Sequence, residues 1–134
     1  MFMQAWGHYG TAWPVIAQQL GVRPDVGRRS LTVVPRVPEG QKRIAGNSIR
    51  IGDKGAVAVR ALRDDDIYET RVTLRSDDVR GLRIGATVPR GTKVGTVRLD
   101  GRRVATTLTA TNAGIEVTVR VPKPRGRHVV TVET

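Results

Sequence analysis

The chain has no cysteine, few aromatic residues and no long apolar run among its 134 residues. Without cysteine it forms neither a disulfide nor a thiolate metal site, and its redox compartment cannot be read from the sequence. No segment approaches the ~20 apolar residues that a membrane-spanning helix needs. Residues 1–8 lack the basic segment and unbroken apolar core of a signal peptide. We therefore expect a cytoplasmic protein with no membrane partner.

Acidic residues are also scarce, with 12 Asp and Glu against 23 Lys and Arg, which gives a net charge of +11. Nearly all of the excess is arginine, and it is spread along the whole chain. Only the pairs Arg28-Arg29 and Arg102-Arg103 and the segment 123–127 are locally dense, and no aromatic residue lies between them to stack on bases. The distribution argues against nucleic acid as a partner, although a basic nucleic-acid-binding domain stays as an alternative.

What the chain does contain is a series of short apolar segments separated by turn residues. Residues 68–75 alternate between Tyr, Thr, Val and Leu on one side and Glu, Arg, Thr and Arg on the other, the period of a half-buried antiparallel strand. Asp100-Gly101 predicts a two-residue hairpin turn with positive φ at both positions. Roughly nine such strands, with a turn every eight to twelve residues, predict a mainly β protein, an antiparallel β-sandwich.

One short N-terminal α-helix is expected before the strands. Thr11 is a suitable N-cap, and Pro14 falls in the first turn, where its missing N–H costs nothing. Gly21 suits the left-handed cap, and Pro24 prevents continuation. Between them one apolar stripe recurs at +3 and +4, formed by Trp13, Ile16 and Leu20.

The segment 4–24 also carries a resemblance to a known family. Its run Gln-Ala-Trp-x-x-Tyr-Gly-x-x-Trp-Pro-Val-Ile resembles the last barrel helix of six-hairpin glycosidases of the bacterial glycogen-debranching type. Segments 36–47 and 85–100 are similar to the linker and strands of the β-sandwich that follows that barrel. The resemblance implies two parts: 1–22 as the last helix of an (α/α)6 barrel, and 23–134 as an accessory β-sandwich with a linker at 23–46.

Candidate binding residues follow from this resemblance. It places Trp6, His8 and Tyr9 near the sugar cleft of the parent barrel, so these residues are candidate carbohydrate contacts. The competing and favoured interpretation is that these side chains belong to the barrel core. A large apolar surface in the opening segment predicts an interface, with candidates Phe2, Trp6, Trp13, Ile16 and Leu20.

No catalytic residue, metal site or cofactor is expected. Glycoside hydrolysis needs two carboxylates flanking the bond, and no acidic residue precedes position 22. The run 64–66, three aspartates, lacks the alternating spacing and glycine of a calcium loop and is interpreted as a solvated turn. His128 is expected at the rim of the sandwich, at the start of the last strand.

The resulting hypothesis is a non-catalytic accessory domain that braces the catalytic barrel of a parent glycoside hydrolase. Without that barrel, the chain is expected to self-associate through its N-terminal segment. The alternative is a carbohydrate-binding module, but such modules present rows of exposed aromatics, and Tyr68 is the one aromatic in the whole sandwich segment.

Overall fold

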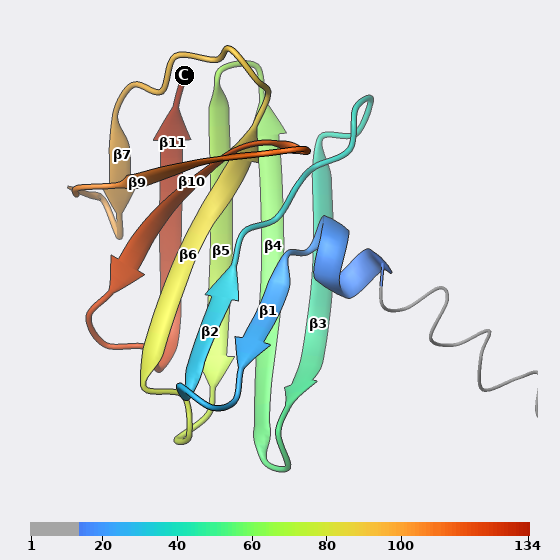
Figure 1. The fold of residues 1–134 in the computed structure, drawn as a ribbon, viewed down its shortest axis with the longest axis vertical. Helices are drawn as coiled ribbons and strands as arrows, with labels where there is room; N and C mark the ends of the chain where they lie inside the picture. The colour runs from blue at the N-terminus through green and yellow to red at the C-terminus, as the bar shows by residue number, and fades with distance from the viewer. Residues whose placement is uncertain (1–13) are drawn as a thin grey trace, which may run out of the picture.

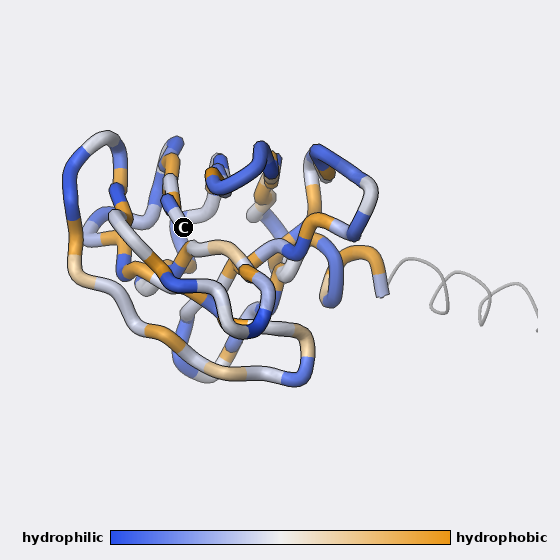
Figure 2. Tube along the Cα trace, turned by 90° about the horizontal axis from the view of Figure 1, so that it is seen from above, coloured by the Kyte–Doolittle hydropathy of each residue, from blue (hydrophilic) through white to orange (hydrophobic). Residues whose placement is uncertain are grey.

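The computed structural model describes residues 14–134. Two sheets pack face to face in two layers (Figures 1 and 2). The five-stranded sheet has the order β1-β2-β6-β10-β9, and the six-stranded sheet has the order β3-β4-β5-β11-β7-β8. The strands are β1 (Val22–Asp25), β2 (Ser30–Val33), β3 (Arg43–Ile51), β4 (Gly55–Asp64), β5 (Ile67–Arg75), β6 (Gly81–Val88), β7 (Val97–Leu99), β8 (Arg102–Arg103), β9 (Thr107–Thr111), β10 (Gly114–Val121) and β11 (Gly126–Glu133).

The core lies between the two sheets and is built from the inward-facing residues of each strand. The alternation expected for residues 68–75 is confirmed, since Tyr68, Thr70, Val72 and Leu74 are all buried. Thr70, a polar residue in this layer, has its hydroxyl satisfied by donating to the carbonyl oxygen of Gly85 at 2.7 Å. That hydrogen bond joins β5 of one sheet to β6 of the other. On the facing sheet Ile84, Val117 and Val119 are buried as well.

The hairpin expected at Asp100-Gly101 is also present. Leu99 pairs with Arg102, and φ is +50° at Asp100 and +82° at Gly101. Both central residues therefore take the left-handed conformation that a type I′ turn requires.

The sandwich is dominated by antiparallel pairs but is not wholly antiparallel. β2 runs parallel to β6, with Leu31 beside Leu82 and Val33 beside Ile84. The expectation of purely antiparallel sheets is therefore wrong at this pair. The physical reason is the path of the chain: after β2 it crosses to the other sheet, builds β3, β4 and β5 there, and only then returns as β6 (Figure 1).

Residues 23–25 belong to β1, where Pro24 lies at the edge of its sheet and its missing N–H breaks no ladder. The range 23–46, expected as a linker, accordingly contains β1, β2 and the first residues of β3. Residues 102–111 contain two short strands, β8 and β9, which belong to different sheets.

The described part of the N-terminal segment is a single π-helical turn, η1 (Pro14–Gln19), and not the α-helix that was expected there. The N–H of Leu20 donates to the carbonyl oxygen of Val15, five residues back, at 2.8 Å. This wider turn is followed at once by Gly21 and β1, so no α-helical ladder develops.

Candidate functional site

The sequence-derived candidates divide between described and undescribed residues. The carbohydrate candidates Trp6, His8 and Tyr9, and the interface candidates Phe2 and Trp13, lie outside the residues that the structure describes. Of the two remaining interface candidates, Leu20 is 3% exposed and belongs to the sandwich core, and Ile16 packs against that core. Both side chains therefore face this domain, and a contact with a second surface stays a prediction.

The junction between η1 and the sandwich is fixed by the backbone. The N–H of Val34 donates to the carbonyl oxygen of Gly21 at 3.1 Å, and the N–H of Arg36 donates to that of Gln19 at 2.8 Å. Gly21 has φ of +62°, and a Cβ there would lie 1.9 Å from the carbonyl oxygen of Val34. Only glycine fits this position, so the backbone between η1 and β1 is held in one conformation.

A polar depression of about 400 Å³ lies beside this junction. Its walls come from η1, β1, the segment after β2 and the β9–β10 turn, and include Gln18, Arg23, Arg36, Asn112 and Glu116. A neighbouring depression of about 340 Å³ shares Arg36 and Asn112 with it. Both depressions were missed by sequence reasoning, because residues from four separate segments meet there.

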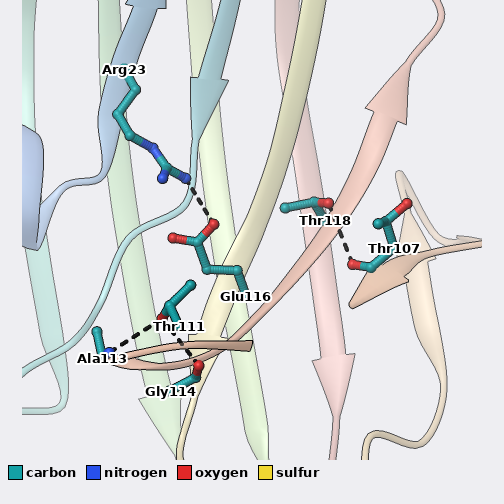
Figure 3. Close-up of polar contacts among 7 residues, drawn as sticks. All are labelled: Arg23, Thr107, Thr111, Ala113, Gly114, Glu116 and Thr118. Atoms are coloured by element: carbon teal, nitrogen blue, oxygen red, sulfur yellow. Dashed lines mark hydrogen bonds and ion pairs between the residues drawn. The ribbon is translucent and has the colours of Figure 1, made fainter. Parts of the chain in front are cut away.

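One ion pair joins two strands in the wall of the first depression. Arg23 on β1 donates to the carboxylate of Glu116 on β10 at 2.9 Å (Figure 3). The turn below is held by Thr111, whose hydroxyl donates to the carbonyl oxygen of Gly114 at 3.1 Å and accepts from the N–H of Ala113 at 3.2 Å. Glu116 is the one carboxylate that lines this depression. Hydrolysis of a glycosidic bond needs two, so the depression holds no acid pair for this chemistry.

His128, the residue expected at the rim of the sandwich, contacts the turn between β7 and β8. His128 is the third residue of β11, and its side chain is only 12% exposed. Its Nδ1 lies 3.0 Å from Oδ2 of Asp100, while Oδ1 of Asp100 accepts from the N–H of Val129 at 2.8 Å. The N–H of Asp100 in turn donates to the carbonyl oxygen of Val129. These contacts fasten the β7–β8 turn to β11, which is a structural role.

The acidic turn at 64–66 is solvent-exposed. Its clearest contact is made by the backbone: the carbonyl oxygen of Asp66 accepts from the N–H of Thr134 at 2.8 Å and from its hydroxyl at 3.1 Å. Among residues 14–134 no group of three or more acidic, histidine or cysteine side chains converges as a metal site would require. In the same part of the chain no helix has the length and apolar character to cross a membrane.

Comparison with known proteins shows a likeness of fold. No family model matches the chain, and no curated protein matches it. Among solved structures it is similar to an alpha-L-rhamnosidase from Dictyoglumus thermophilum, with a TM-score of 0.56 and 16% sequence identity. The match covers 86% of this chain but only 12% of that enzyme. At this identity the likeness shows a shared β fold, found within a much longer glycosidase chain, and lends no support to a glycogen-debranching parent.

Proposed function

We propose that the chain is a non-catalytic accessory β-sandwich of a glycoside hydrolase, which braces a catalytic (α/α)6 barrel through residues 1–22. The observation that carries the proposal is the rigid junction at Gly21. Leu20 is buried in the core, and two backbone hydrogen bonds tie Gln19 and Gly21 to the segment after β2. A domain preceding this point would be held in a fixed orientation, as a brace requires.

Two further observations support the proposal. A sandwich of the same fold is found in a glycosidase chain about seven times as long, since the match covers 86% of this chain and 12% of that one. The opening residues resemble the last helix of a glycosidase barrel. Because the described carboxylates lie on turns, at sheet edges or in ion pairs, the chemistry of such an enzyme would come from the barrel.

The reading frame upstream of Met1 tests this proposal directly. We expect it to encode a barrel continuous with residues 1–22. The longer product should hydrolyse either glycogen or an aryl rhamnoside, and the comparison of the two substrates decides between the glycogen-debranching and rhamnosidase types. An upstream sequence that encodes no barrel would contradict the proposal.

The isolated chain should be inert, and this is measured separately. Purified protein is incubated with glycogen, trehalose, aryl glucosides and aryl rhamnosides, and product is compared with a buffer blank. Turnover above the blank that disappears when one Asp or Glu is replaced would show that the chain is itself an enzyme.

A further inference from the structure

The outer surface of the six-stranded sheet collects arginine side chains that are far apart in the sequence. Strand alternation turns Arg50 of β3, Arg60 of β4, Arg71 and Arg75 of β5 and Arg127 of β11 away from the core. The paired positions confirm this placement: Arg60 lies opposite Arg71, Arg75 and Arg50 flank Ala56, and Arg127 lies opposite Thr73. We call these five residues the arginine face.

Little negative charge compensates this face. Glu69, on the same side of β5, forms an ion pair with Arg71. The other four arginines form no ion pair with any residue of the described chain, 14–134. Arg60 and Arg71 are also directly opposite each other, a placement that brings their Cβ atoms to about 5 Å and is destabilising for like charges. A bound anion would remove that repulsion.

A shallow depression of about 260 Å³ lies on the same outer surface, and Arg75 is the member of the arginine face that lines it. Ala56 and Ala58 form its floor, because their small side chains leave the surface of β4 low between longer neighbours. Asn47 and Ser48 form one edge, in the bulge of β3 where the register shifts between Gly46 and Ile49. The depression thus offers an amide and hydroxyl groups next to the guanidinium of Arg75.

The side-chain groups of this surface indicate which kind of anionic ligand it would bind. Guanidinium groups match carboxylates with paired hydrogen bonds, and neutral hydroxyl and amide groups suit the hydroxyls of a sugar ring. Tyr68, the aromatic residue of the sandwich, is buried in the core, so residues 14–134 offer no ring on this face for stacking on nucleic-acid bases or neutral sugars. The face is part of a sheet surface and presents no helix or ribbon to enter a DNA groove.

We propose that the arginine face binds an acidic polysaccharide, one whose sugar rings carry carboxylates. The arginines contact the carboxylates, while Asn47, Ser48 and Thr73 contact ring hydroxyls in the depression. This inference does not depend on the accessory role proposed above, because it rests on the register and charge of the six-stranded sheet alone.

Calorimetric titration of the full chain with oligogalacturonate at fixed ionic strength tests the proposal. The double variant Arg60→Gln/Arg75→Gln keeps the Arg71–Glu69 pair and removes two charges from the face. We expect it to bind at least about tenfold more weakly than the unsubstituted chain. The matched control is Arg83→Gln/Arg120→Gln, which removes two directly opposed, exposed arginines from the outer surface of the other sheet. It should change the affinity less than about twofold.

Four outcomes would overturn the proposal. Equal losses in the two double variants would mean that only net charge matters. Tighter binding of a DNA duplex than of oligogalacturonate at the same ionic strength would identify a nucleic-acid surface. If amylose binds as tightly as oligogalacturonate, the carboxylates do not contribute to binding. If oligogalacturonate does not bind at millimolar concentration, the face is not a site for an acidic polysaccharide. The thermal midpoint of each variant is measured first, and Arg127→Gln replaces any variant that loses its fold.

Discussion

Leu20 links the N-terminal segment to the sandwich, and Leu20→Ala tests how much that link contributes to stability. The side chain is 3% exposed, and its Cδ1 lies 2.4 Å from the point where a Cβ on Gly46 would be. Removing three buried carbons from such a site costs about 2–5 kcal/mol, because the lost burial and the residual cavity add. We expect about 3 kcal/mol. With an unfolding entropy of about 2.1 cal/mol/K per residue, this lowers the melting temperature by about 10 °C.

Thermal unfolding followed by circular dichroism and calorimetry measures the change. Val15→Ala is the matched control, since Val15 lies in the same π-helical turn but is 43% exposed. Its effect should stay within about 0.5 kcal/mol. If Leu20→Ala costs no more than Val15→Ala, Leu20 does not belong to the core, and the rigid junction that supports the bracing role is absent.

Three further predictions concern register, backbone and association. Val119→Ala should destabilise the fold by about 1–3 kcal/mol, because Val119 faces the core, whereas Thr118→Ala should be near neutral, because Thr118 faces outward. Equal effects of the two substitutions in denaturant titrations would mean that the register of β10 is wrong. Gly21→Ala should cost at least about 2 kcal/mol, because both its positive φ and the nearby Val34 oxygen oppose a Cβ; a neutral result would contradict the described junction. By light scattering the intact chain should self-associate and a chain beginning at Pro14 should be monomeric; an intact monomer with quenched, blue-shifted tryptophans would count against self-association.

The sequence predicts those parts of the fold whose signal is local. The alternation of apolar and polar residues over 68–75 predicts which face of that strand is buried. Asp100-Gly101 predicts its turn because few residue pairs tolerate positive φ twice in succession. The strand β1 was not predicted, because the proline at position 24 indicates the end of a helix and is also tolerated in an edge strand. The division of 102–111 between two sheets carries no local signal, because both halves are equally compatible with one strand.

The binding surfaces are harder to predict for the same reason. Alternation alone places Arg71 and Arg75 on the outer side of β5, and that much is readable from the sequence. That Arg60 lies opposite Arg71, and Arg50 in line with Arg75, depends on strand order and register. The arginines therefore look scattered along the chain although the fold gathers five of them on one face.

The parallel pair of β2 with β6 has a consequence for how the protein folds. Leu31 must find Leu82, and the whole of β3, β4 and β5 lies between them in the chain. Closing so long a loop is entropically costly, whereas the β3–β4–β5 meander needs only short turns. During synthesis β1 and β2 therefore leave the ribosome before the other strands of the sandwich but acquire their place in the sheet only after β6 has emerged. Until then the apolar side chains of β2 are exposed, and this interval is when the nascent chain is most open to aggregation.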